Sequence, residues 1–198
     1  MDAVKIVNKI SEEHETIKNV YFLACGGSLV DLYPGYYFLR AESAVMDAQW
    51  ISAREFALTP PKKLGKDSLL IICSHSGKTK ECLEAAKVGM NAGAAVVTMT
   101  HAPGSACDTD EWISVVYDWA PGVKEAEKPQ GIVLRILNEL MKVQEPGYVL
   151  YDKIAEGFDK IDEIIAKAVK DQQNAAWLFA EKYSEEPNLY IMASGASY

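Results

Sequence analysis

The sequence predicts a three-layer α/β sandwich, in which helices cover both faces of one parallel β-sheet. Short apolar runs alternate along the chain with segments of helical periodicity, which is the pattern of repeated βα units. Two of these runs, residues 20–25 and 69–73, are apolar at every position, as strands are when both faces are buried. Glycine and hydroxyl residues gather directly after both runs, which is typical of loops at the carboxyl end of such a sheet.

The composition fits one compact soluble domain. The 198 residues are 49% hydrophobic and 24% charged, which are ordinary values for a globular protein with a full core. A net charge of −8 argues against nonspecific nucleic-acid binding and against an anionic membrane surface as partner. No apolar stretch approaches the length of a membrane span, and residues 1–5 lack the apolar run of a signal peptide. We therefore expect a cytoplasmic protein.

The cysteines and histidines show no metal-binding or disulfide pattern. The four cysteines are Cys25, Cys73, Cys82 and Cys107, and the three histidines are His14, His75 and His101. Since no pair has CxxC spacing, we interpret the cysteines as small core residues in a reducing compartment. The histidines are too scattered for a set of metal ligands, so we predict no metal site.

The first third of the chain predicts a helix, a strand, a second helix and a second strand. The opening helix is amphipathic, and its stripe consists of Val7, Ile10, His14 and Ile17. The first strand is the run 20–25, and the following helix reaches about Arg40 with a kink at Pro34. Residues 44–48 form a short second strand. We interpret His14 as a packed histidine.

The middle of the chain continues this alternation. Residues 51–56 predict a short helix that stops at 59–61, because Thr-Pro-Pro cannot continue it. Further helices run from about 79 to 91, where Gly93 suits the C-terminal cap, and from about 128 to 143. The remaining strands are 69–73, 94–100 and 112–117. The inward positions of the last helix are Val133, Ile136, Leu137, Leu140 and Met141.

The positions of the polar loops favour a flavodoxin-like strand order, 2-1-3-4-5. In that order the first and third strands are neighbours, and their helices leave to opposite faces of the sheet. A crevice therefore opens at the carboxyl ends of these two strands. Gly26, Gly27 and Ser28 follow the first strand and residues 74–79 follow the third, so both loops would line the crevice.

The segment Ser74-His75-Ser76-Gly77-Lys78-Thr79 is the strongest candidate for a binding site. Three hydroxyls and a glycine crowd a strand-to-helix turn, where unpaired N–H groups and a partial positive charge favour an anion. Lys78 and Lys80 add nearby cations. If the hydroxyls served only to cap the helix, one would suffice. Three at this spacing predict a phosphate cradle.

The last quarter of the chain differs from the rest. Apolar residues recur at alternating spacings of four and three, which predicts one long helix with an apolar seam. The seam consists of Ile154, Phe158, Ile161, Ile165, Ala168, Gln172, Ala175 and Phe179. It would pack either on the domain itself or on another domain or subunit, and the sequence leaves both open.

Residues 190–197 repeat the order of residue types found in 21–28, from an aromatic through apolar and small residues to glycine and serine. Either two buried strands resemble each other by chance, or a second copy of the domain begins here. We favour the second interpretation. It divides the chain into a domain at 1–147, a connecting helix at 148–186, and the first strand and loop of a truncated second copy at 187–198.

The two glycine- and serine-rich loops resemble those of the sugar isomerase (SIS) domain family, with Ser74-x-Ser76-Gly77-x-Thr79 after one strand and Gly26-Gly27-Ser28 after an earlier one. This family binds phosphosugars on a flavodoxin-like fold, usually as two tandem copies. The resemblance covers the whole chain and is strongest to the branch of deglycases that act on 6-phosphorylated fructosamines, such as fructoselysine 6-phosphate and fructose-asparagine 6-phosphate. The segments most similar to that branch are 25–28, 44–48, 74–81 and 193–198.

The resemblance also implies roles for individual residues. Ser74, Ser76 and Thr79 would hydrogen-bond the substrate phosphate together with backbone N–H groups near Gly77, and Ser28 would contact the sugar or its phosphate. Further residues that would line the site are Gly26, Gly27, His75, Lys78 and Glu127. Deglycase-like members often have asparagine in place of Lys78. The catalytic glutamate and histidine of relatives lie in the second copy, downstream of Tyr198, and their site tends to form across a dimer interface. We therefore expect a homodimer that needs no metal or organic cofactor.

The function expected from the resemblance is the cleavage of fructose-amino acid 6-phosphates to glucose 6-phosphate and a free amino acid. Alternatives are an aldose–ketose phosphosugar isomerase, the isomerase half of a glutamine–fructose-6-phosphate amidotransferase, and a phosphosugar sensor without enzymatic activity. A sensor usually carries a DNA-binding helix-turn-helix, for which the short N-terminal helix leaves no room. Dinucleotide binding is disfavoured, because Gly26-Gly27-Ser28 does not complete G-x-G-x-x-G, although Asp47 lies near the end of the predicted second strand.

Overall fold

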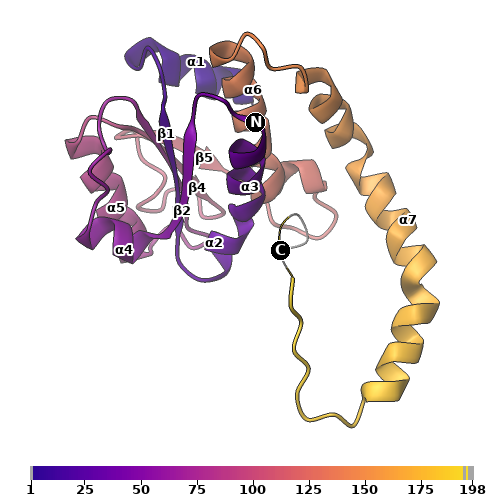
Figure 1. The fold of residues 1–198 in the computed structure, drawn as a ribbon. Coiled ribbons are helices and arrows are strands. Elements are labelled where there is room, and N and C mark those ends of the chain that lie inside the picture. The colour runs from indigo at the N-terminus through magenta and orange to yellow at the C-terminus, as the bar shows by residue number, and fades with distance from the viewer. Residues whose placement is uncertain (1, 194, 196–198) are drawn as a thin grey trace.

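The computed structural model describes residues 2–193 and 195, and its centre is a five-stranded parallel sheet in the order β2-β1-β3-β4-β5 (Figure 1). The strands are β1 Asn19–Ala24, β2 Asp47–Ser52, β3 Ser68–Cys73, β4 Ala95–Thr100 and β5 Ile113–Val116. The helices are α1 Ala3–Glu13, α2 Gly27–Asp31, α3 Tyr33–Glu42, α4 Ala53–Leu58, α5 Lys80–Asn91, the 3-10 turn η1 Glu125–Glu127, α6 Pro129–Gln144 and α7 Tyr151–Tyr183. The predicted fold class and strand order are confirmed.

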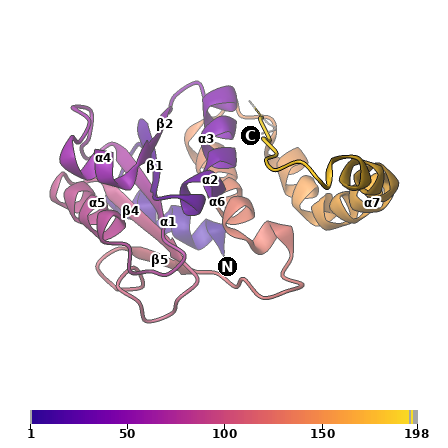
Figure 2. The same cartoon turned by 90° about the horizontal axis from the view of Figure 1, so that it is seen from below.

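Two hydrophobic cores form the layers of the sandwich, one on each face of the sheet. Figure 2 shows α4 and α5 on one face and α1, α3 and α6 on the other. Alternate residues of β1 face opposite cores, since side chains alternate along a strand. Phe22 packs in the core beneath α6, and Tyr21 and Leu23 pack in the core beneath α4 and α5. The five inward positions predicted for α6 are all fully buried.

Two of the predicted helices differ from the structure, one in where it ends and the other in being divided. The opening helix stops at Glu13, and His14 follows it with its ring Nδ1 2.8 Å from the Lys66 carbonyl oxygen, while Ile17 is buried outside the helix. The single kinked helix predicted up to Arg40 is two helices, α2 and α3. Pro34 lies in the first turn of α3, where a missing N–H costs no helical hydrogen bond.

The second strand lies further along the chain than the predicted 44–48. Its start is set by Glu145, whose carboxylate accepts hydrogen bonds from the Ser43 hydroxyl and, at 3.0 Å, from the Ala44 N–H. These bonds hold residues 43 and 44 in a loop, so that β2 begins at Asp47. The strand is only half-buried and three of its six residues are polar, so a search for apolar runs does not reveal it.

The predicted long C-terminal helix is confirmed as α7, which has 33 residues and extends away from the sheet (Figure 1). Its first turns contact α6 and η1, whereas Val169 and Phe179 of its later turns are exposed. The strand expected at the C-terminus is not formed in residues 187–193, and Ile191 there is 96% exposed. A strand forms only against a neighbouring strand, and this segment has none. Residues 194 and 196–198 of that prediction lie outside the described residues.

Three of the four cysteines are buried, Cys25 is half-buried, and all four are free thiols. Residues 2–193 and 195 contain no helix both long and apolar enough to cross a membrane.

Candidate phosphate site

The two polar loops meet at the carboxyl ends of β1 and β3, as predicted. The two strands are parallel neighbours, with Leu23 opposite Ile72. The helices after β1 pack in the α6-side core through Leu32 and Leu39, whereas α5 packs in the opposite core through Cys82 and Ala86. The helices thus leave to opposite faces, which is the arrangement that opens a ligand crevice in parallel α/β sheets.

The turn at 74–79 is closed by hydrogen bonds of its own. The N–H of buried Ser74 donates to the Met99 carbonyl at 2.9 Å, and the Gly77 N–H donates to the Ser74 carbonyl at 2.9 Å. The hydroxyls of Ser74 and Thr79 lie 2.9 Å apart. The Ser76 hydroxyl is exposed and accepts a long 3.3 Å bond from the Lys78 N–H. The Gly77 N–H, predicted to face a phosphate, is therefore already used inside the turn.

The helix-capping interpretation of the hydroxyls fails at Thr79. Thr79 is the N-cap of α5, yet its side chain makes no capping hydrogen bond and is paired with Ser74 instead. The Thr79 side chain therefore leaves the first backbone N–H groups of α5 available as donors at the positive end of the helix. Two hydroxyls that share one hydrogen bond leave one O–H for a further acceptor, and Ser74 also hydrogen-bonds the Cys107 thiol. This arrangement suits an anion better than it suits a cap.

Gly77 fixes the shape of the turn. Its φ of 64° lies in the left-handed region that favours glycine, and a Cβ there would lie 1.9 Å from the Ser105 Oγ. Its carbonyl oxygen accepts the Cys107 N–H at 3.1 Å, which ties the turn to the loop after β4. Only glycine fits this position.

The chain is similar to several known proteins along most of its length. Fructosamine deglycase FrlB of Bacillus subtilis strain 168 is 34% identical over 93% of this chain and 56% of its own length. A crystal structure assigned as a phosphosugar isomerase of Salmonella typhimurium LT2 has a TM-score of 0.88 at 31% identity, covering 98% of this chain and 58% of that one. A glutamine–fructose-6-phosphate aminotransferase (isomerizing) of Clostridium tetani is 27% identical over 94% of this chain and 31% of its own length. No family model matches the chain.

These similarities agree with the resemblance to the sugar isomerase (SIS) family that the two loops predicted. The chain spans 56% of the deglycase and 31% of the aminotransferase.

Around the cradle, aromatic rings gather on His75, which the sequence marked only as a lining residue. The His75 ring stacks on His101 at 4.9 Å, and its Nδ1 lies 3.0 Å from the Tyr117 hydroxyl. Trp119 stands edge-on to it at 5.5 Å and is 44% exposed. These partners follow β4 and β5, so the sequence could have flagged them only as residues at strand ends.

Asp31 is a second residue that the sequence reasoning missed. It lies one turn after Ser28 in α2 and accepts a hydrogen bond from the Gln130 Nε2 at 2.6 Å. Burial raises the pKa of its carboxyl, and His75 and the Gln130 hydrogen bond act in the opposite direction. The spacing of three residues from Ser28 was the available signal. Asp31 therefore places a half-buried acid next to the cradle.

The thiol of Cys73, at the end of β3, is not a nucleophile. Burial raises its pKa to about 12, although hydrogen bonds with Tyr117 and Ser28 favour the thiolate. Burial also raises the pKa of the Tyr117 hydroxyl. Both groups stay protonated at neutral pH and support the crevice as neutral side chains.

The remaining predicted residues lie as follows. Gly26 is the N-cap of α2 and Gly27 is its first residue, and both are exposed, whereas Ser28 is half-buried and Lys78 is exposed. Asp47 begins β2 and is therefore at the amino end of the sheet, paired with Lys63 at 2.7 Å. That position is opposite the crevice and speaks against dinucleotide binding. No cluster of three His, Cys, Asp or Glu side chains suited to a metal ion occurs within 2–193 and 195.

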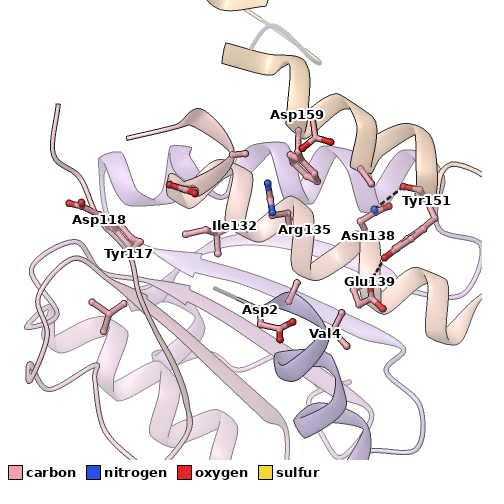
Figure 3. Close-up of a pocket in the computed structure, with 16 residues that line it drawn as sticks. Asp2, Val4, Tyr117, Asp118, Ile132, Arg135, Asn138, Glu139, Tyr151 and Asp159 are labelled. Atoms are coloured by element: carbon pink, nitrogen blue, oxygen red, sulfur yellow. Dashed lines mark hydrogen bonds between the residues drawn. The ribbon is translucent and has the colours of Figure 1, made fainter. Parts of the chain in front are cut away.

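Glu127 lies in η1 and lines a different cavity, shown in Figure 3, which is bounded by α1, α6 and α7.

Proposed function

We propose that this SIS domain grips the phosphate of a 6-phosphorylated fructosamine, and that the whole protein is a deglycase. The observation that carries the proposal is the hydroxyl-lined turn 74–79 at the β1/β3 crevice, with its Ser74–Thr79 pair and the uncapped start of α5. The 34% identity to fructosamine deglycase FrlB supports the choice of substrate class.

Local donors hold the phosphate, because the net charge of −8 repels an anion from the molecule as a whole. Ser76 and the free O–H of the Ser74–Thr79 pair donate to the phosphate oxygens, and the N-terminus of α5 adds its partial charge. Ser28 closes the site from the neighbouring loop. Lys78 is exposed and adds a cation at the rim. Gly26, Gly27 and His75 line the path from the phosphate toward the sugar.

The reaction then moves a proton along the linear form of the sugar. A base removes a proton from C1 of the ketoamine while O2 is protonated, and C2 then gains a proton while the nitrogen loses its own, which converts the C1–N bond to an imine. Water hydrolyses the imine to glucose 6-phosphate and a free amino acid. The acid and base are a glutamate and a histidine expected downstream of Tyr198, and a phosphate anchor supplies the orientation that such proton transfers need. The proposal includes a second SIS copy beginning at 187, a homodimer and a cytoplasmic location.

Calorimetric titration tests the binding step. Fructose-lysine 6-phosphate and glucose 6-phosphate are expected to bind, whereas unphosphorylated fructose-lysine and NAD are not. Ser76→Ala should lower the affinity for both phosphosugars by about tenfold, which corresponds to the loss of one hydrogen bond to a charged group. Ser184→Ala, at an exposed site beyond α7, is the matched control. Equal affinity for phosphorylated and unphosphorylated ligands would refute the phosphate anchor.

A second candidate is an isomerase or the isomerase half of an amidotransferase, which the 27% identity to the aminotransferase favours. The reaction distinguishes the two: a deglycase releases the amine from a fructosamine 6-phosphate, and an isomerase interconverts fructose 6-phosphate and glucose 6-phosphate. If the protein binds both substrates and converts neither, it is a sensor.

A further inference from the structure

A cavity of about 650 Å³ lies between α1, α6 and α7, and the function proposed above does not use it (Figure 3). Its volume falls in the range of small-molecule sites. None of the residues 26–28 or 74–79 lines it. Its walls come from the start of α1, the exposed side of α6 and the first turns of α7.

The guanidinium of Arg135 stands in the middle of this cavity. Its Cζ lies 4.7 Å from the centre of the Phe158 ring, which holds the group against α7. Its Nε is buried without a hydrogen-bond partner, and no residue among 2–193 and 195 forms an ion pair with it. A guanidinium has five N–H donors in a rigid fork that matches the two oxygens of a carboxylate. A guanidinium in a cavity without an ion-pair partner is therefore suited to bind a carboxylate from outside the chain.

The rest of the cavity carries the opposite charge. Its carboxylates are those of Asp2, Asp118, Glu127, Glu139 and Asp159. Glu139 accepts a hydrogen bond from the Tyr151 hydroxyl at 2.7 Å, which fixes it on the wall. One guanidinium among five carboxylates leaves a net negative cavity, which favours a ligand with more than one cationic group and a single carboxylate.

We propose that this cavity binds a free α-amino acid with an amine in its side chain, such as lysine. Its carboxylate pairs with Arg135, and its two ammonium groups lie against the acidic wall, with Asp159 facing the guanidinium from α7. The aliphatic stem packs on Phe158. The site does not depend on the phosphate cradle, although an amino acid is also what the proposed deglycase would release.

Three ligands test separately whether the carboxylate and the side-chain amine are recognised. Calorimetry of the protein should show L-lysine binding at least tenfold more tightly than cadaverine, which lacks the carboxylate, and than L-norleucine, which lacks the side-chain amine. Equal affinities for lysine and cadaverine would reduce the cavity to an unspecific acidic patch and overturn the proposal. So would the absence of saturable lysine binding at millimolar concentration.

Variants test the residues. Arg135→Gln should lower lysine affinity at least tenfold and leave cadaverine affinity equal or higher, because a like charge is removed, whereas Arg54→Gln, at an exposed arginine paired with Glu84, should have no effect. Asp159→Asn should lower the affinity for lysine more than the affinity for norleucine. Asp152→Asn, on the same helix, is the control.

Phosphosugar titration of the same samples shows that each variant is folded. If the cradle binds no phosphosugar, the lysine comparison still decides this proposal. If Arg135→Gln leaves lysine binding intact, or instead changes only the sedimentation coefficient, the cavity is not an amino-acid site.

Discussion

Replacing Gly77 by alanine tests how the cradle is built. The left-handed φ of 64° costs an alanine about 1–2 kcal/mol. The new Cβ would also lie 1.9 Å from the Ser105 Oγ and 2.8 Å from the Thr100 Oγ1, and overpacking of this kind costs about 1–3 kcal/mol. We therefore expect Gly77→Ala to lower the free energy of unfolding by about 2–5 kcal/mol in urea denaturation.

Two comparisons separate the steric cost from the backbone cost. Gly104 has a φ of 70° but open space around it, so Gly104→Ala should show only the backbone cost of about 1–2 kcal/mol. Adding Ser105→Gly to Gly77→Ala should recover part of the difference, because the contact at 1.9 Å is removed. If Gly77→Ala unfolds at the same urea concentration as Gly104→Ala, the turn is not packed as described. The folded fraction of Gly77→Ala should also bind phosphosugars less tightly than the wild type.

Three further changes probe the site and its supports. Thr79→Val removes the partner of the Ser74 hydroxyl, so phosphosugar affinity measured by calorimetry should fall about tenfold, and unchanged affinity would contradict the cradle. Glu145→Ala removes the hydrogen-bond acceptors of the Ser43 hydroxyl and the Ala44 N–H, so the free energy of unfolding should fall by about 1–3 kcal/mol in urea denaturation. Glu145→Gln should lower it less. The pKa of Asp31 is raised in the folded protein, so its contribution to stability is lost as pH rises above the unfolded value near 3.8. Asp31→Asn should therefore gain stability relative to the wild type as pH rises above that unfolded value, and a difference that does not change with pH would refute the burial of this acid.

The parts of the fold that the sequence predicted well are those whose residues carry their own signal. β1 and β3 are apolar at every position after their first residue because both faces are buried, and α6 shows its inward side as a helical stripe. The start of β2 carries no such signal, since it depends on Glu145 about a hundred residues away.

The same distinction applies to the site. The hydroxyls of 74–79 are adjacent in the chain, and a local pattern revealed them. The Tyr117 hydroxyl reaches His75 from 42 positions away, and Gln130 reaches Asp31 from 99 positions away, so only the strand order brings these pairs together. No local pattern marks Arg135, because its cavity is formed only when α7 packs beside α6.

Charge explains why the two candidate sites are built differently. In a chain of net charge −8, a phosphate cannot be attracted by the molecule as a whole, and the cradle instead gathers short-range donors within one turn. The cavity at Arg135 uses the opposite arrangement, with one cation inside an acidic wall that agrees in sign with the whole molecule. Salt should therefore affect them in opposite ways, because screening relieves the repulsion of a phosphosugar and weakens the attraction of a diamine. Raising the ionic strength should leave phosphosugar affinity equal or higher while it lowers that of lysine, and a parallel loss at both sites would contradict this division.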